Sequence, residues 1–560
     1  MSRIIGIDLG TSTTEVSIIN NGKPEMVLNL DGNIITPTMI GIADDGRMVF
    51  GERARAQLLT EPEKTVMEIK RKIGTGEMIT MDGKQYSAME LSARFLQYVK
   101  IYVEEALGEE VNRAVISVPA YFDDKKRQET MEAGKKAGFQ VERILNEPTA
   151  AALSYGLEHL DEESHILIYD FGGGTFDVTL LEMFDGVLEV KASSGDNALG
   201  GKDFDEIIVD HLVKEFKAKE GLNLRKIPTA MVRLKEEAQK AKILLSVQED
   251  CRIIIPFIAE KNGQPVSLDY TMTRKRFEEM AKELIDRTHR PMEVVFADSE
   301  INKEDIDHIL LVGGSTRMPM IVNDVEAYLG KKPLVCLDPD FAVAQGTAIQ
   351  AGLIEGTIDA KNSIFMTDVN PFTLGIRTFN GFSYEHMSVI IPRNVTIPVT
   401  KSDIFSTVGD MQTKVSIEVY QGESHNVNDN HFLGEFMIRD IPPKKQGKEK
   451  IEVEFSYNIN GLLEVKATIL STGQEAGILI NMIDKDREES RRDVSEWKKG
   501  RFAKEFRTVI RWAEKQIKMD PENSLWEHEL YKLKLAILED DYEYAREIAD
   551  KIEGFRDLFD

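Results

Sequence analysis

Two segments of this 560-residue chain repeat one pattern, a short apolar run that ends in an aspartate followed at once by a glycine-containing loop. GIDLGTSTTEV occupies residues 6–16, and YDFGGGTFDV occupies residues 169–178. The aligned pairs are Asp8 with Asp170, Gly10 with Gly172, Thr13 with Thr175, and Val16 with Val178. A single copy is often only a hairpin turn, but two copies at one offset, each with strand-like flanks, predict two related halves packed face to face.

The residue types in these loops indicate phosphate binding. Glycine lets the backbone turn tightly and approach a bulky anion, and the N–H groups of such a turn can cradle phosphate oxygens. A threonine adds a hydroxyl donor, and an aspartate at the end of a strand can bind Mg²⁺ directly or through its waters. We therefore expect one phosphate clamp with two jaws, in a cleft between the two halves.

A third glycine loop, LLVGGSTRMP, suits the nucleoside end of such a ligand. Gly313 and Gly314 permit a close approach, and Arg317 could stack on adenine or on the sugar. Taken alone, this loop is more typical of an ordinary strand-to-helix turn.

The pattern of apolar and polar residues changes along the chain, which predicts several domains. Residues 1–361 alternate strand-like and helix-like segments, which predicts an α/β domain. Residues 370–485 carry short alternating runs such as KIEVEFSYNI and LLEVKATIL, with a probable hairpin at Asn460-Gly461, which predicts an antiparallel β-sandwich. Residues 362–369 form the expected linker, and residues 486–560 are predicted to be amphipathic helices with a break near Asp520-Pro521.

Charge and composition exclude some classes of function. The net charge of −26 argues against nonspecific binding to nucleic acid or to an acidic membrane. No apolar stretch is long enough to span a membrane, and the N-terminus lacks the pattern of a signal peptide. We therefore expect a cytoplasmic protein with no nucleic-acid or membrane partner.

Five segments, in order, resemble the DnaK-type heat-shock 70 chaperones: IIGIDLGTSTTEV, AVISVPAYFDDKKRQ, ILNEPTAAALSYGL, YDFGGGTFDV and ILLVGGSTRMP. The resemblance implies a duplicated actin-like, ribonuclease-H-like ATPase domain, then a peptide-binding β-sandwich and a short α-helical lid. The short helical tail and the altered linker look more like the HscC-like branch than like general DnaK.

The resemblance also implies an ATP site. Its phosphate loops match Gly10, Thr11, Ser12, Thr13, Gly172, Gly173, Gly174 and Thr175, and its metal-site aspartates match Asp8 and Asp170. Its hydrolytic residues match Lys70, Glu147, Thr175 and Asp177. This set suits phosphoryl transfer to water, which needs positioning and charge neutralisation more than covalent chemistry. The implied cofactors are ATP or ADP and Mg²⁺, with K⁺ as a further candidate ion.

On the nucleoside side, the matching residues are Gly200, Gly201, Lys242 and Ser246, in addition to Gly313, Gly314 and Arg317. The chain departs from the family at Gln239, where glutamate is common, so we expect nucleotide affinity to shift and binding to survive.

The resemblance further implies a peptide groove lined by Ile376, Phe379, Phe405, Val408, Val415, Ile417 and Leu462. Val415 matches the central pocket, and Phe379 and Val408 match the pair that arches over the peptide. Periodicity alone would make all of these core residues. Pro119 and Asp368 match residues that couple the two domains, although Thr367 interrupts the linker's apolar run.

The leading hypothesis is an ATP-dependent chaperone that binds and releases extended hydrophobic peptides, with a J-domain co-chaperone as partner and the need for an exchange factor left open. The short lid predicts fast peptide exchange. The alternatives are a small-molecule kinase of the same ATPase fold and an uncoupled nucleotide-binding scaffold. The intact set of phosphate-site residues argues against the scaffold.

Overall fold

The computed structural model describes residues 3–58, 60–157, 159, 162–334, 338–358, 365–479 and 494–519, and individual residues between Leu530 and Ile552. The chain forms two compact units, Met1–Asn481 and Met482–Asp560. Across the described residues, we find no helix whose length and apolar character would let it cross a membrane.

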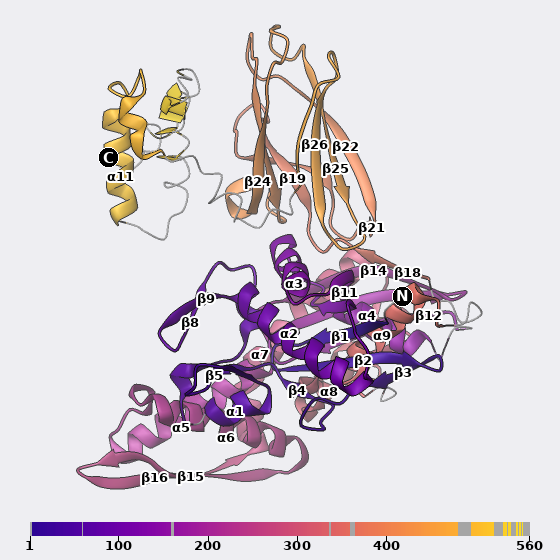
Figure 1. Ribbon diagram of the computed structural model, residues 1–560. Coiled ribbons are helices and arrows are strands. Elements are labelled where there is room, and N and C mark those ends of the chain that lie inside the picture. The colour runs from indigo at the N-terminus through magenta and orange to yellow at the C-terminus, as the bar shows by residue number, and fades with distance from the viewer. Residues whose placement is uncertain are drawn as a thin grey trace. The chain divides into compact units, whose positions relative to one another are not determined.

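The first half of the duplication is a six-stranded sheet with the order β11-β10-β1-β2-β3, in which β4 also pairs with β2 (Figure 1). Its strands are β1 (Ile4–Leu9), β2 (Thr13–Asn20), β3 (Lys23–Met26), β4 (Thr36–Pro37), β10 (Arg113–Val118) and β11 (Gln140–Asn146). Strand β1 lies parallel to β10 and antiparallel to β2. The β2–β3 turn uses Asn21 and Gly22 at positive φ, as the Asn-Gly pair predicts.

The second half repeats this arrangement in the order β17-β12-β13-β14-β18-β21. Its strands are β12 (Ser164–Phe171), β13 (Phe176–Phe184), β14 (Val187–Asp196), β17 (His308–Val312), β18 (Phe365–Val369) and β21 (Thr396–Ile397). Strand β12 lies parallel to β17 and antiparallel to β13, as β1 does with β10 and β2. The shared topology confirms the two related halves that the repeated sequence predicts.

Two helices pack closely against each other and complete the centre of this α/β region: α4 (Glu147–Gly156) and α9 (Ala342–Glu355). A Cβ atom on Gly346 would lie 1.7 Å from the carbonyl oxygen of Ala150, so only glycine allows the two backbones to approach this closely. Helix α4 begins with Glu147 and Pro148 and ends at Gly156, and proline in the first turn of a helix is favourable because its missing N–H would have no partner there.

The other long helices of the α/β region are α2 (Ala88–Leu107), α3 (Asp124–Lys136), α5 (Gly201–Glu220), α6 (Pro228–Val247), α7 (Arg274–Ser299) and α8 (Pro319–Leu329). The charged segment from about 202 to 250 forms two helices, α5 and α6. Helix α6 packs against the hairpin of β15 (Asp250–Lys261) and β16 (Gln264–Thr273), and both helices lie on the same side of it (Figure 1).

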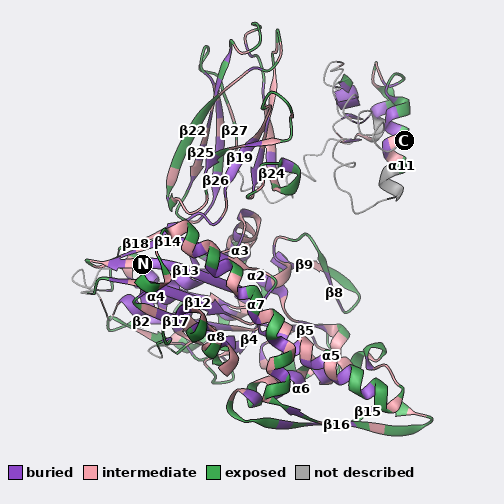
Figure 2. Cartoon of the chain, turned by 180° about the vertical axis from the view of Figure 1, so that it is seen from behind, coloured by how far each residue is buried: buried purple, intermediate pink, exposed green. Residues whose placement is uncertain are grey.

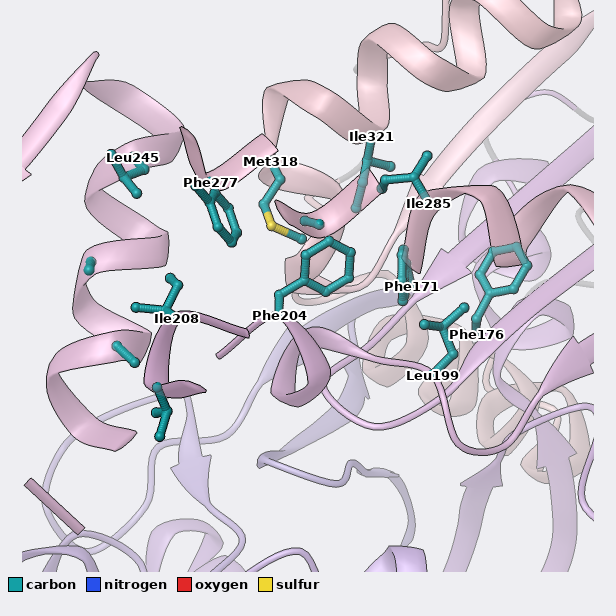
Figure 3. Close-up of a cluster of buried hydrophobic side chains, with 14 of the residues drawn as sticks. Phe171, Phe176, Leu199, Phe204, Ile208, Leu245, Phe277, Ile285, Met318 and Ile321 are labelled. Carbon is teal, nitrogen blue, oxygen red and sulfur yellow. The ribbon is translucent and has the colours of Figure 1, made fainter. Parts of the chain in front are cut away.

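An aromatic core supports the second glycine loop. Phe204 of α5 lies between Phe171 of β12 and Phe277 of α7, with ring centroids 5.7 and 6.3 Å away (Figure 3). Phe176 packs on Phe171 from the other side of the loop at 5.3 Å. Because both ends of the loop are anchored in this buried cluster, the loop is held in place by apolar packing on each side.

Smaller elements lie at the edges of the α/β region. They are α1 (Glu52–Leu58), the sheet of β5 (Ile40–Ile42), β6 (Met48–Phe50) and β7 (Thr65–Val66), and the hairpin of β8 (Met78–Met81) and β9 (Lys84–Ser87). Strands β12 and β13 are mostly buried, whereas the β15–β16 hairpin carries many exposed residues (Figure 2).

The alternating runs after residue 370 form two antiparallel four-stranded sheets, β20-β19-β23-β24 and β22-β25-β26-β27. The strands are β19 (Leu374–Thr378), β20 (His386–Ile391), β22 (Val399–Ser406), β23 (Val415–Gln421), β24 (His431–Ile438), β25 (Lys450–Tyr457), β26 (Leu463–Ile469) and β27 (Glu475–Leu479). Residues of both sheets share one core, which includes Ile417, Phe455 and Leu463. The predicted turn at Asn460-Gly461 joins β25 to β26.

The expected linker, residues 362–369, is in part a strand. Phe365–Val369 forms β18, and the start of the predicted segment lies outside the described residues. In the second unit, η8 (Ser495–Lys499) and α11 (Arg507–Met519) share a core that contains Trp497, Phe506 and Ile510. The helix break predicted at Asp520-Pro521 also lies outside the described residues.

Replacing Gly346 by alanine should destabilise the α/β region by about 2 kcal/mol, because the added methyl group forces α9 away from α4. Urea unfolding followed by circular dichroism would measure the decrease in the free energy of unfolding of the α/β region. Ile354→Ala, at a partly exposed position on the same helix, is the matched control and should change stability by less than about 1 kcal/mol. Equal effects of the two substitutions would contradict the packing argument.

Candidate functional site

The two glycine loops meet across one cavity, which contains about 550 Å³ of non-protein space, part of it open to solvent. The first loop joins β1 to β2, and the second joins β12 to β13. The lining residues are Asp8, Gly10, Thr11, Ser12, Thr13, Glu15, Lys70, Glu147, Asp170, Gly172, Gly173, Thr175, Val312, Gly313, Gly314, Pro339, Asp340 and Val343. The structure thus brings together most of the residues predicted to hold phosphate and metal.

Close backbone contacts shape the second loop. The N–H of Gly201 donates to the carbonyl oxygen of Gly172 at 3.0 Å, and the Ser315 hydroxyl donates to the same oxygen at 2.8 Å. A Cβ atom on Gly200 would lie 2.4 Å from the nitrogen of Gly174, and one on Gly313 would lie 2.6 Å from the Phe171 carbonyl oxygen. Gly313 also has a φ of +81°, so both the close backbone contact and the backbone conformation require glycine at this position.

Lys70 is buried and forms an ion pair with Glu147 at the start of α4. It lies in a short 3-10 helix, η2 (Ile69–Lys72), and its Nζ lies 5.8 Å from the centre of the Phe122 ring. The sequence motifs predicted both residues individually, and the structure places the two side chains in direct contact. One ammonium group therefore faces the phosphate cleft with a carboxylate beside it.

The aspartates at the strand ends have strongly perturbed acidities. Burial, and then the charge of Glu147, raises the pKa of Asp8 to about 7, while the Ser117 hydroxyl donates to its Oδ1 at 2.8 Å. Burial, and then Glu147 and Asp177, raises the pKa of Asp170 well above its usual range. The Oδ2 atom of Asp170 is buried and has no hydrogen-bond partner. Such a carboxylate is stabilised by a proton or by a cation.

Asp177 lies on β13 directly opposite Asp170. Burial, and then Glu147, raises its pKa to about 7, and its Oδ1 accepts a hydrogen bond from the backbone N–H of Tyr121 at 3.0 Å. The loop that begins at Pro119 therefore contacts a predicted hydrolytic residue through its backbone.

The donor set fits Mg²⁺, which prefers oxygen ligands and keeps several waters. Asp8 and Asp170 lie on opposite jaws of the cavity, and the unpartnered Oδ2 of Asp170 is available as a ligand. In the described part of the chain, no cluster of three or more His, Cys, Asp or Glu side chains could hold a metal by itself. The protein would therefore share the ion with phosphate oxygens and water.

Of the residues predicted for the nucleoside, Gly313 and Gly314 line the cavity, whereas the lining does not include Gly200, Gly201, Lys242, Ser246 or Arg317. Lys242 donates to the Gly201 carbonyl oxygen at 2.7 Å and pairs with Asp205 at 2.8 Å. Arg317 pairs with Asp338 at 2.8 Å and Asp340 at 2.6 Å. Ser246, one turn after Lys242 on α6, donates to the Lys242 carbonyl oxygen. Their predicted contacts with the nucleoside stay predictions.

Sequence reasoning missed several residues of the site. Arg71 donates to the carbonyl oxygen of Gly174 at 3.0 Å and pairs with Asp203 at 2.7 Å, which ties the second loop to α5. Asp340 and Val343 line the cavity from a segment near the end of the α/β region, and no local sequence pattern indicates them. Glu15 also lines the cavity, and the repeat could have revealed it, because it aligns with Asp177 at the offset that pairs Asp8 with Asp170.

The two predicted coupling residues lie near the site. Asp368 of β18 is buried and accepts a hydrogen bond from the Asn146 side chain at 2.7 Å, and Asn146 directly precedes Glu147. Pro119 begins the loop that holds Tyr121 against Asp177.

The predicted groove residues divide into two groups. Ile376 and Ile417 are buried in the sandwich core, and Phe405 and Val415 are half-buried against it. Val408 is exposed, and Phe379 stacks obliquely on Tyr384 at 4.5 Å.

Leu462 lies apart from Phe405, another of the predicted groove residues. It lies in the β25–β26 turn, next to Tyr457, whereas Phe405 pairs with Ile451 at the opposite end of β25. The turn contacts the α/β region, where the Ile144 N–H donates to the Asn460 side chain at 3.2 Å. The length of β25 thus separates Leu462 from Phe405, and a role of Leu462 in a peptide groove stays a prediction.

Comparison with known protein families identifies a relationship that covers most of the chain. The model of the family described as Hsp70 protein matches residues 4–551, which is nearly the whole chain.

Replacing Lys70 by methionine should lower single-turnover ATP hydrolysis by about 100-fold or more, because the ammonium group that offsets developing phosphate charge is lost. Rapid-quench measurement with radiolabelled ATP would test this. Lys72→Met, on the same short helix but paired with Glu77 at the surface, is the matched control and should leave the rate within about twofold. The double variant Lys70→Met/Glu147→Gln removes the unpaired carboxylate. A normal rate in that variant would rule out the assigned role of Lys70.

Proposed function

Because the chain belongs to the Hsp70 family, we propose that it binds and releases extended hydrophobic segments of unfolded proteins under the control of ATP binding and hydrolysis. Family membership makes the chain an ATPase and an ATP-dependent chaperone, which binds nucleotide with Mg²⁺ and acts on unfolded peptides with co-chaperones. The proposal concerns how peptide release is coupled to the nucleotide, and which residues achieve it.

The observation that carries the proposal is the position of β18. Its first residues pair in parallel with β14 of the α/β region, from Val187↔Phe365 to Glu189↔Thr367. Its last residues pair antiparallel with β21 at the base of the sandwich, Asp368↔Ile397 and Val369↔Thr396. One strand thus joins the sheet that carries Asp170 and Asp177 to the peptide-binding sandwich. A change in that sheet on nucleotide binding would act directly on the linker strand.

Side-chain contacts between the α/β region and the sandwich support this coupling. Arg393 forms a two-pronged ion pair with Asp298, with distances of 2.7 and 2.8 Å. The adjacent Asn394 accepts a hydrogen bond from the N–H of Ser193 in β14 at 3.1 Å. At the other side of the junction, the hydroxyl of Tyr457 donates to Asp124 at 2.8 Å. Peptide and nucleotide should therefore influence each other reciprocally.

For hydrolysis, we assign charge neutralisation to Lys70 and orientation of the attacking water to Glu147 and Asp177. The backbone N–H groups of the two glycine loops and the Thr175 hydroxyl hold the phosphates in place. A Mg²⁺ ion held by Asp8 and Asp170 with the phosphates would offset negative charge on the transferring group. The cavity geometry supports this assignment because these side chains, apart from Asp177, line one space, and Asp177 lies directly opposite Asp170.

For the peptide, we propose a groove at the end of the sandwich that carries Phe379, Phe405, Val408 and Val415. An extended segment would bind there through backbone hydrogen bonds and one or two apolar pockets. The exposure of Val408 supports an accessible contact, whereas Ile376 and Ile417 support the groove from the core beneath it. The large Phe379 side chain should narrow the range of accepted peptides.

We also propose a branch of the family, a partner and a location for the protein. The altered linker, with Thr367 inside its apolar run, supports membership of the HscC-like branch. We also propose a J-domain co-chaperone as partner and a cytoplasmic location, and we leave dependence on an exchange factor open. The family match does not favour the small-molecule kinase alternative.

The first test is peptide release. ATP added to an ADP-bound chain loaded with a fluorescent apolar peptide should accelerate release by about tenfold or more, because ATP favours the weakly binding sandwich. Stopped-flow anisotropy would measure the rate. The Lys70→Met variant should still respond, since ATP binding precedes hydrolysis. Asp368→Asn, which removes a buried carboxyl group from the linker strand, should reduce the acceleration of peptide release by ATP. Unchanged release with intact hydrolysis would favour the uncoupled scaffold.

Contact between the two domains should also strengthen as pH falls. Burial raises the pKa of Asp124 to about 7 at the junction, with smaller opposing effects from Tyr457 and Arg127. Separation of the domains would expose the carboxyl and return its pKa toward the ordinary value, so docking takes up a proton. The docking equilibrium should therefore rise about tenfold between pH 8 and pH 6.

Interdomain fluorescence energy transfer in the ATP-bound full chain would measure docking. An Arg393→Ala background would bring the equilibrium into a measurable range, because it removes the ion pair to Asp298. Asp124→Asn keeps a hydrogen-bond acceptor for Tyr457 but cannot titrate, so its docking should be independent of pH. The prediction would be contradicted if docking decreased on acidification. It would also be contradicted if docking of Asp124→Asn depended on pH as strongly as docking of the chain that keeps Asp124.

A further inference from the structure

The repeated hairpins carry a second matched carboxyl residue, beyond the aspartates that first revealed the repeat. In the first sheet, Asp8 of β1 pairs in register with Glu15 of β2. In the second sheet, Asp170 of β12 pairs in register with Asp177 of β13. Each jaw of the clamp therefore presents two carboxyl groups on directly opposed residues. Directly opposed residues of an antiparallel pair project from the same face of the sheet, with Cβ atoms about 5 Å apart.

Glu15 is as buried as its counterpart Asp177, and each of the two lies opposite an aspartate on the neighbouring strand. Only 3% of Glu15 and 1% of Asp177 is exposed. Glu15 lines the same cavity as Asp8, Asp170 and the two glycine loops. It is thus a buried acidic side chain that faces the phosphate space and does not lie on the protein surface.

Among the residues that the structure describes, no basic side chain forms an ion pair with Glu15, and Lys70 acts on it only as a weaker influence than burial and Asp8. Among the residues that line the cavity, Lys70 is the only basic one, and it pairs with Glu147. The nearby Arg317 pairs with Asp338 and Asp340. A buried carboxylate without an ion-pair partner is costly in its ionised form, even with the Thr13 hydrogen bond that Glu15 has, and phosphates brought into the same space would raise that cost. A cation that enters with the nucleotide removes the difficulty.

We propose that Glu15 is a positioning residue for the metal ion of the nucleotide site, acting as the first-half counterpart of Asp177. Asp8 and Asp170 would contact the ion, and Glu15 and Asp177 would hold its bound waters from the two jaws. Carboxylates in this outer position orient the ligands of an ion and strengthen its binding. This inference rests on the proposed Mg²⁺–nucleotide site and assigns it a further residue, independently of any coupling to peptide.

The test is Mn²⁺ binding to the full chain saturated with ADP, measured by the loss of the free-ion electron paramagnetic resonance signal. Glu15→Gln preserves size and should weaken Mn²⁺ binding about tenfold or more. Asp177→Asn should weaken it to a similar degree. Glu25→Gln, at an exposed position on the neighbouring strand β3, is the matched control and should bind Mn²⁺ as the unmodified chain does.

Two further measurements separate this role from a structural one. ADP binding without metal reports whether each variant keeps its site, and Glu15→Asp keeps the charge, so it should recover part of the Mn²⁺ affinity that Glu15→Gln loses. Unchanged or tighter Mn²⁺ binding in Glu15→Gln would overturn the proposal, because Glu15 would then be neutral or repulsive toward the ligand. Equal losses in Glu15→Asp and Glu15→Gln would also overturn it. If the unmodified chain bound neither ADP nor Mn²⁺, the nucleotide site itself would be refuted.

Discussion

Negative charge buried around Lys70 is the constraint on which the nucleotide site depends. Asp8, Asp170 and Asp177 all have raised pKa values, because burial and the neighbouring Glu147 both disfavour their ionised forms. A protein tolerates such a cluster only when protons, a basic group or a metal ion supply positive charge. Since Lys70 is already paired with Glu147, protons can supply the remaining positive charge, and a divalent cation that arrives with a nucleotide would replace them.

The sheets that create this cluster also extend beyond it. Strand β12 ends at the site, and the hairpin of β13 and β14 continues from it to the linker strand β18. The Asn146 side chain holds Asp368 of β18 and stands next to Glu147. The Tyr121 backbone holds Asp177, and its ring lies 4.4 Å from that of Phe372 at the start of the sandwich. The residues of the phosphate site are thus joined through a few contacts to the linker strand and to the start of the sandwich, which supports the proposed coupling.

Much of this could be predicted from the sequence. The repeated Asp-x-Gly loops predicted two related halves, and the matching neighbours of β1 and β12 confirm them. Alternating residues predicted the antiparallel sheets after residue 370. Other features could not be predicted, because they depend on segments distant in the chain. Asp340 reaches the cavity from the far end of the α/β region, and an aligned motif does not say at which end of the sandwich the turn that contains Leu462 will lie.

By itself, the sequence determined the local features: which residues turn at Asn21-Gly22, where glycine lets a loop approach phosphate, and which runs alternate as strands. These follow from backbone preferences and side-chain periodicity over a few residues. The tertiary structure decided which charges meet. Only folding brings Lys70 to Glu147, buries Glu15 in the phosphate cavity and turns the linker residues Phe365–Val369 into a strand shared by two sheets. The physical reason is that burial and electrostatic interaction depend on distance in space, which separation along the chain does not specify.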